Sequence, residues 1–176
     1  MIPRNTSPGI RVWNLLRQKH LLTKSLAQIA IAACPEYPGA ALALAELLGP
    51  TLLPGNFKAL IASDAGAAYE YAAAILQGPF SEGEVAIAVD GLSALYYATH
   101  VLHGPFPAGE SKIAESPAHS ISYARRALHG PFPLGEPAIA NSKYCEEYYD
   151  AFYADNYPSF GAWRESIVQT VKAREV

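Results

Sequence analysis

The chain has 176 residues, of which 51% are apolar and 16% are charged, so it is suited to one globular domain and lies outside the disordered class. Its net charge of −3 excludes a general attraction to nucleic acid or to an anionic membrane, although a local basic patch is compatible with it. Cys34 and Cys145 lie too far apart in sequence for a disulfide framework or a zinc site built from thiols. The first residues lack the apolar core of a signal peptide, and no run approaches the roughly 20 apolar residues of a membrane span. We therefore expect a cytoplasmic protein with no membrane contact.

The N-terminal part of the chain is predicted to hold helices with a weak repeat pattern. Residues 1–24 are expected to form an N-terminal cap with a helix over residues 11–19. Residues 25–62 are expected to form degenerate repeats, one of which ends at Ile31-Ala32. The next has its corner at Gly49-Pro50 and ends at Ile61-Ala62, and this corner is longer than those of the later units.

The middle of the chain, residues 63–140, contains a regular repeat of 26 residues, because Gly-Pro-Phe stands at residues 78–80, 104–106 and 130–132. Each unit is predicted to contain a longer helix of about 13 residues, a tight corner and a short helix. An N-cap residue precedes each longer helix, since its side-chain oxygen can accept a hydrogen bond from the first backbone N–H groups. The predicted N-caps are Asp64, Asp90, Ser116 and, in the following unit, Ser142.

The corner of each unit combines three residues with different tasks. The glycine is predicted to end the longer helix in the left-handed conformation, and the proline prevents the helix from continuing. The phenylalanine is predicted to plug the corner with an apolar ring. The short helix then ends at an Ile-Ala pair, at residues 87–88, 113–114 and 139–140. Neither helix is long enough to be stable alone, so stacking of the units must supply the stability.

Residues 141–176 are expected to form a C-terminal capping repeat. Asn156 is predicted to replace the corner glycine there, and residues 163–171 to form a final helix. The predicted fold is all-α: an α-solenoid of about five 26-residue helix-corner-short-helix repeats with degenerate capping units, in a single domain over residues 1–176.

Residues that recur at one repeat position are interpreted as packing residues, because every unit meets the same packing problem. A ligand-stacking ladder is the less favoured interpretation of the recurring tyrosines, and catalysis is the less favoured role of the recurring glutamates. These positions are Tyr71, Tyr97, Tyr123 and Tyr149, and Glu84, Glu110 and Glu136.

One face of the longer helix changes from unit to unit, while the opposite face is apolar or small throughout. We call the changing face the variable stripe; it comprises residues 70, 73, 74 and 77 and their counterparts 96, 99, 100 and 103, then 122, 125, 126 and 129, then 148, 151, 152 and 155. Variation on a repeating scaffold is how solenoids individualise binding, although solvent exposure alone also permits it. The predicted partner-binding residues are Tyr96, Thr99, His100, His103, Arg125, Arg126 and His129.

Three sharper roles for this patch are less favoured. His100 and His103 have metal-compatible spacing, but the next histidine is about 10 Å away in the following unit and no carboxylate or thiol lies nearby on the stripe. The paired arginines suit phosphate contacts, yet a few basic groups in an acidic chain indicate nucleic-acid binding only weakly. The nearby serines lack a strained elbow or a glycine-rich oxyanion loop. No catalytic residue, metal or cofactor is therefore predicted.

A second candidate surface lies near the C-terminus, where acidic residues interleave with tyrosines. Such a surface suits a basic partner or imitation of nucleic acid, and the plainer interpretation is a solvated face with tyrosines packed beneath it. The acidic residues are Glu146, Glu147, Asp150 and Asp155.

The unit YAxxxLxGPFPxGExxIA resembles the short helical repeats of uncharacterised bacteriophage-encoded proteins, over about residues 59–140. The resemblance implies a phage or phage-derived origin, and hence a location in the host cytoplasm, but it transfers no functional residue. By analogy with other small helical phage proteins, it implies an inhibitor or modulator of a host protein, or a virion-associated component. We therefore expect a non-enzymatic protein-protein interaction module; the alternative is a nucleic-acid-associated helical repeat protein that uses the Arg/His patch.

Overall fold

The computed structural model describes residues 37–51, 53 and 55–174, and all regular secondary structure in these ranges is helical. The all-α class is therefore confirmed for this part of the chain. The expected N-terminal cap helix and the repeat ending at Ile31-Ala32 lie outside the described residues. The chain divides into two compact units, residues 1–87 and 88–176. They are described separately below, and the single-domain organisation stays a prediction.

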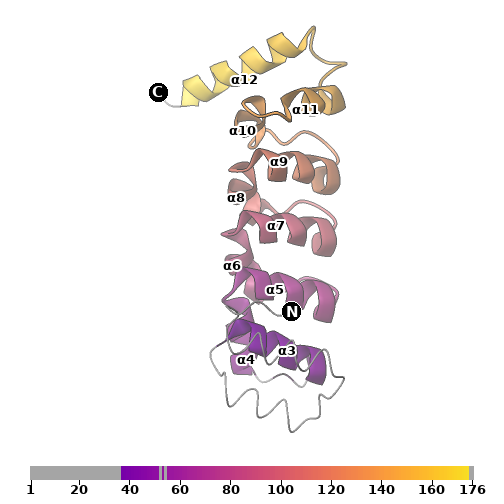
Figure 1. The fold of residues 1–176 in the computed structure, drawn as a ribbon, viewed down its shortest axis with the longest axis vertical. Coiled ribbons are helices and arrows are strands. Elements are labelled where there is room, and N and C mark those ends of the chain that lie inside the picture. Colours follow the sequence, from indigo (N-terminus) through magenta and orange to yellow (C-terminus); the bar gives the residue numbers. More distant parts are fainter. Residues whose placement is uncertain (1–36, 52, 54, 175–176) are drawn as a thin grey trace, which may run out of the picture. The chain divides into compact units, whose positions relative to one another are not determined.

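In the first unit, α3 (Pro38–Leu48) packs against α5 (Ala65–Glu70). The helix between them in sequence, α4 (Gly55–Ala62), packs against both (Figure 1). Its elements are α3 (Pro38–Leu48), α4 (Gly55–Ala62), α5 (Ala65–Glu70), η1 (Tyr71–Leu76), η2 (Ser81–Gly83) and α6 (Glu84–Ala88). α3 ends before Gly49, whose φ is +74°, and α4 ends at Ala62, while the assignment of these helices to a degenerate repeat stays a prediction.

In the second unit, α7 and α9 lie side by side, and α8 packs against both. The elements are α7 (Gly91–Tyr97), η3 (Ala98–Leu102), η4 (Pro107–Gly109), α8 (Glu110–Ala114), α9 (Pro117–Tyr123), η5 (Ala124–Leu128), α10 (Glu136–Ala140), α11 (Cys145–Phe152) and α12 (Phe160–Arg174). The predicted final helix is α12, which begins three residues earlier and ends three residues later than expected. It packs against α10 and α11 at the end of the unit.

Side-chain caps start three of the longer helices, as predicted. Asp64 Oδ1 accepts the N–H of Ala67 at 2.8 Å, and Asp90 Oδ1 accepts that of Ser93 at 2.7 Å. Ser116 caps α9, with a proline at its first position. The fourth predicted cap is wrong: α11 begins at Cys145 with Tyr144 as its N-cap residue, and Ser142 Oγ instead accepts the N–H of Tyr144 in the preceding turn.

The end of each regular longer helix differs from the prediction by one residue. The left-handed residue is not the glycine but the residue before it: Gln77, His103 or His129, with φ between 50° and 51°. The last turn widens to a π-helix, and both this residue and the following glycine donate their N–H groups to one carbonyl, that of Ala72, Ala98 or Ala124. The prediction that Gly78, Gly104 and Gly130 adopt the left-handed conformation is therefore wrong.

The capping repeat is also one residue out of register with the regular units. Tyr148, not Tyr149, takes the place of Tyr123, because its hydroxyl group accepts a corner phenylalanine N–H in the same way. Tyr148 is fully buried, so it does not belong to the variable stripe. Asn156 does not replace the corner glycine, since α11 ends at Phe152 and Asn156 has no positive φ.

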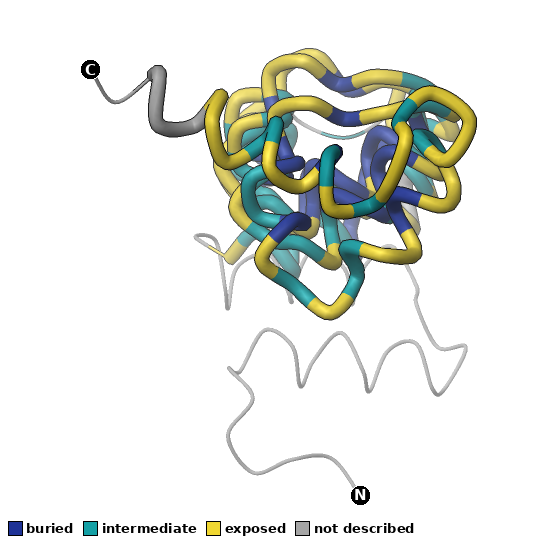
Figure 2. The backbone as a smooth tube through the Cα atoms, turned by 90° about the horizontal axis from the view of Figure 1, so that it is seen from above, coloured by how far each residue is buried: buried dark blue, intermediate teal, exposed yellow. Residues whose placement is uncertain are grey.

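The recurring phenylalanines are buried, as predicted, and each lies edge-on to the tyrosine of its own unit. The ring centroids of Tyr71 and Phe80, Tyr97 and Phe106, and Tyr123 and Phe132 are 4.9 to 5.1 Å apart. Seen from above, the buried residues lie towards the interior and the turns are mostly exposed (Figure 2). The corner thus joins the long and short helices of a unit through one aromatic pair.

A different glycine, that of each Gly-Glu pair, occupies the tightest space. A Cβ added to Gly109 would lie 2.6 Å from Ala94 Cβ and 2.7 Å from Phe106 Cδ1. Gly83 and Gly135 meet the same obstruction in their own units. The short helix therefore approaches the long helix closely only because this residue has no side chain.

We expect Gly109→Ala to lower the free energy of unfolding by about 1 to 3 kcal/mol, because the new methyl group overpacks the corner. Gly104→Ala is the matched control, since its Cβ would meet only Leu102 O at 3.7 Å. The control should stay within about 0.5 kcal/mol of the native chain in chemical denaturation. Equal losses for both variants would contradict this assignment of the tight glycine.

The left-handed residue generates a second prediction. Gln77→Gly should raise the free energy of unfolding by roughly 0.5 to 1 kcal/mol, because relief of left-handed strain outweighs the added flexibility of the unfolded chain. Gln77→Ala keeps the strain and is the control in the same thermal denaturation series. A loss of stability in the glycine variant would show that Gln77 contributes a side-chain interaction of its own.

Candidate functional site

The variable stripe of the regular units is exposed at most of its positions and half-buried at Ala73, Thr99 and Ser122. Glu70, Tyr96, Ala74, His100 and Arg126 are all exposed. By contrast, the alanines at 72, 98 and 124 on the same helices are fully buried. One face of each longer helix therefore packs and the other meets solvent, while the binding role of the exposed face stays a prediction.

Tyr96 and His100 form one aromatic element on this face. They stand one helical turn apart, and their rings stack with centroids 5.4 Å apart and planes 23° apart. Thr99 lies between them in sequence, but its Oγ1 donates to Leu95 O at 2.9 Å within the helix. The Tyr96–His100 pair thus offers a flat ring surface, whereas the hydroxyl proton of Thr99 is already used.

His103 and His129 are exposed, but their position has a backbone task as well. Each is the left-handed residue that ends its helix, in the place of Gln77. Histidine is among the residue types enriched in that conformation. The recurrence of histidine at this position therefore has a structural reason that does not require a ligand.

Arg125 and Arg126 line a groove between α9 and α11. Its volume is about 230 Å³, and its lining comprises Ala118, Ile121, Ser122, Arg125, Arg126, Tyr144 and Glu147. Arg125 forms an ion pair with Glu147 across the groove. Arg126 is exposed and has no ion-pair partner among the described residues.

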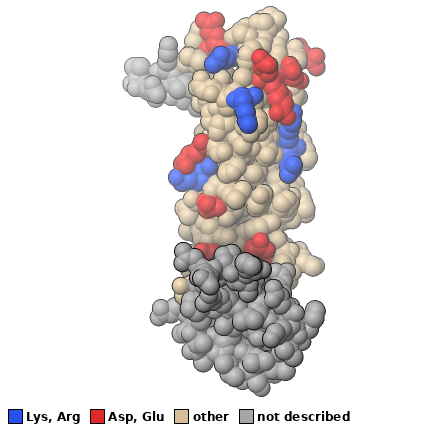
Figure 3. All heavy atoms as spheres, viewed as in Figure 1, with Lys and Arg blue, Asp and Glu red and all other residues tan. Residues whose placement is uncertain are grey.

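The groove joins the two candidate surfaces that the sequence suggested. Glu147 belongs to the acidic C-terminal group, and it lies against the arginine pair of the preceding unit. Figure 3 shows basic and acidic side chains next to one another at the end of the second unit, on a described face that is otherwise mostly uncharged. The sequence did not indicate Glu147 as the partner of Arg125, nor Tyr144 as a lining residue of the groove. A signal existed, because residues nearly one repeat apart lie on neighbouring helices.

The tyrosines of the acidic C-terminal surface pack inwards. Tyr148 and Tyr149 are buried, and the rings of both have centroids 5.9 Å from that of the fully buried Trp163. Tyr153 stacks on the same indole at 5.7 Å. The carboxylates of Glu146, Glu147, Asp150 and Asp155 are on exposed residues. This arrangement is that of a solvated face over an aromatic core.

Within residues 88–176, Tyr123 and Tyr148 each form a hydrogen-bonded bridge to the preceding 26-residue repeat, which we call the staple. The Phe106 N–H donates to Tyr123 Oη at 2.8 Å, and Tyr123 Oη donates to Glu110 Oε1 at 2.9 Å. In the next unit, Tyr148 bridges the Phe132 N–H and Glu136 in the same way. The carboxylate of Glu136, which is buried, also accepts the Tyr153 hydroxyl at 2.5 Å. These groups satisfy one another's hydrogen bonds within the scaffold.

Burial raises the pKa of Tyr123 above its ordinary value; the Phe106 N–H acts in the opposite direction, and Glu110 adds to the increase. Burial likewise raises the pKa of Tyr148 and Tyr153. The folded chain thus holds protons that the unfolded chain releases at about pH 10.

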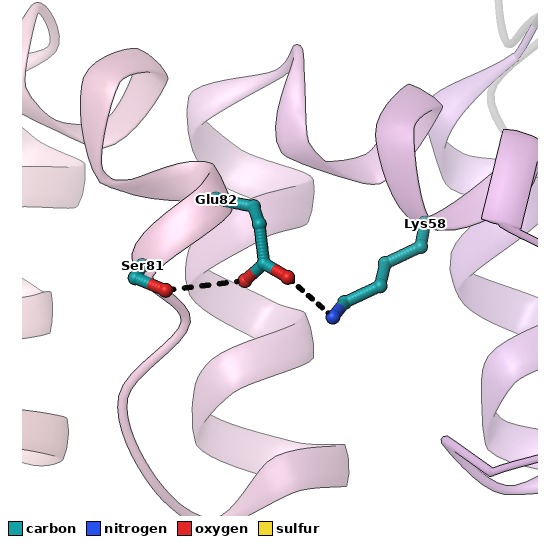
Figure 4. A network of polar contacts seen from close by, with 3 residues as sticks. All are labelled: Lys58, Ser81 and Glu82. Atoms are coloured by element: carbon teal, nitrogen blue, oxygen red, sulfur yellow. Dashed lines mark hydrogen bonds and ion pairs between the residues drawn. The ribbon is translucent and has the colours of Figure 1, made fainter.

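A separate polar cluster lies at the corner of the first unit (Figure 4). Lys58 of α4 binds Glu82 of η2 with an Nζ–Oε1 distance of 2.5 Å, and Ser81 Oγ donates to Glu82 Oε2 at 3.3 Å. The hydrogen bond raises the pKa of Lys58 and lowers that of Glu82. Because both side chains are largely exposed, we assign this ion pair a minor structural role.

Among the described residues, no group of three or more metal-ligating side chains occurs. None of the helices searched within the described ranges combines the length and apolarity needed to cross a membrane. Comparisons with protein-family models, curated proteins and solved structures gave no match.

We expect Tyr123→Phe to lower the free energy of unfolding by about 1 to 3 kcal/mol, because it leaves the buried Phe106 N–H without an acceptor. Tyr144→Phe is the control, since the Tyr144 hydroxyl makes no hydrogen bond within the described part of the chain. The stability of the native chain should also fall as the pH rises above about 10, where the unfolded chain loses tyrosine protons that the folded chain retains. This alkaline loss should be smaller in Tyr123→Phe. An identical pH profile for both chains would contradict the staple.

Proposed function

We propose that the chain is a non-enzymatic protein-protein interaction module, built as an α-solenoid that presents the variable stripe to a partner. The observation that carries the proposal is the division of roles within one repeat. The buried tyrosines at 71, 97 and 123 and the buried alanines at 72, 98 and 124 recur from unit to unit, whereas an exposed position of the same helices holds Ala74, His100 or Arg126. A scaffold whose buried residues recur and whose exposed residues differ between repeats suits recognition of an extended surface.

The ion pair between Arg125 and Glu147 favours a protein partner over nucleic acid. Phosphate binding depends on several unpaired cations along one surface. Here the carboxylate of Glu147 already pairs with one of the two arginines. The resemblance to phage-encoded repeats would make the partner a host protein or a virion component.

The test compares partners captured from a source-cell lysate by three chains. The stripe variant carries His100→Ala, Arg125→Ala and Arg126→Ala; His103 is left intact because of its backbone role. The control variant carries Ser111→Ala and Leu134→Ala, which change exposed residues outside the longer helices. Because exposed helix positions accept alanine, both variants should unfold within about 0.5 kcal/mol of the native chain.

We expect the control to retain the native protein partner and the stripe variant to lose it. Retention of every partner by the stripe variant would contradict the assigned face. Capture that nuclease treatment abolishes would instead support the nucleic-acid alternative.

A further inference from the structure

The groove between α9 and α11 has the size of a side-chain pocket. Its volume, about 230 Å³, is below the roughly 300 to 1,000 Å³ of sites for small organic ligands. Ile121 is buried, and Tyr144 is partly buried on the opposite side. The groove therefore suits one or two side chains of a partner segment rather than a cofactor.

The charge of the groove selects the kind of side chain. Its charged lining residues are Arg125, Arg126 and Glu147, which leaves one positive charge in excess. The ion pair with Glu147 occupies Arg125. The guanidinium of Arg126, which has no ion-pair partner in the described part of the chain, is suited to two parallel hydrogen bonds with a carboxylate.

The arginine pair belongs to this unit and not to the scaffold. The equivalent residues are Thr99 and His100 one repeat earlier, and Ala73 and Ala74 two repeats earlier. A groove between α3 and α5 lies at the corresponding place of the first unit, yet the charged residues that line it are Asp64 and Glu70. The repeat thus builds a groove in both places, and only one of them attracts an acid.

Two exposed apolar residues lie one 26-residue repeat before the groove residues of α9. Leu92 and Tyr96 are 44% and 38% exposed on α7, which packs against α9. They occupy the repeat positions of Ala118 and Ser122, two lining residues of the groove, so they face the same side at a spacing of roughly 10 Å. Tyrosine and arginine are among the residue types enriched in binding hot spots.

We infer that the groove between α9 and α11 binds an Asp or Glu side chain from an acidic segment of a partner protein. Arg126 makes the direct contact, and Arg125, which pairs with Glu147, lies beside it. Leu92 and Tyr96 receive an apolar residue of the same segment. This inference rests on the proposed interaction function and names the chemistry of the partner.

The test selects a displayed library of random peptides, each about twelve residues long, on the full chain, with Arg126→Ala as the counter-target. Enriched peptides should carry Asp or Glu together with an aliphatic or aromatic residue, and Arg126→Ala should not enrich them. Enrichment of peptides without acidic residues, or of the same acidic peptides by Arg126→Ala, would overturn the inference, as would no enrichment at all. Non-acidic peptides that the stripe variant fails to bind would still support the proposed function.

Affinities of one synthetic enriched peptide then locate the contact. Arg126→Ala should weaken binding at least about tenfold, and Glu147→Gln should strengthen it severalfold by releasing Arg125. Arg164→Ala, at an exposed position of α12, is the control and should leave the affinity unchanged. Replacing the acidic peptide residue by its amide should weaken binding to the native chain but not to Arg126→Ala. A single-stranded oligonucleotide that binds through Arg126 more tightly than the peptide would overturn the carboxylate assignment.

Discussion

The contact between a side-chain-free glycine and a buried phenylalanine ring sets the geometry of every regular unit. Gly83, Gly109 and Gly135 each lie against the phenylalanine of their own corner and against a small residue of the long helix. That small residue is Ala68, Ala94 or Ser120. Because the short helix comes this close, the ring is enclosed and the tyrosine of the same unit can meet its edge. The remaining packing of the unit follows from this approach.

The tyrosine then connects that unit to its neighbour. In the second unit of the chain, the corner exposes a phenylalanine N–H to the next long helix, where a tyrosine hydroxyl accepts it and donates to a glutamate. An unsatisfied N–H at this buried place would destabilise the fold. The pairing therefore specifies which residue of the next long helix must lie against this N–H. Near the end of the chain this requirement decides the register: the capping repeat shifts by one residue so that Tyr148 reaches Phe132.

A scaffold fixed in this way leaves the outer helix face free to differ. The exposed positions hold glutamate and alanine in one unit, tyrosine and histidine in the next, and serine and two arginines in the third. The proposed function and the proposed acidic partner both depend on these residues. Since they lie outside the glycine, phenylalanine and tyrosine contacts, their chemistry can change without loss of the fold.

The sequence by itself determined the helical class, the 26-residue period, three N-caps and the buried corner phenylalanines, because each depends on local backbone chemistry or on a pattern repeated within the chain. It misplaced the left-handed residue, since the widened last turn of the helix moves that conformation from Gly104 to His103. Only the tertiary structure decided that Tyr148 replaces Tyr149 and that Glu147 meets Arg125. Those pairings depend on how one helix seats on another, and a shift of one residue in a connecting turn changes them without altering the repeat pattern.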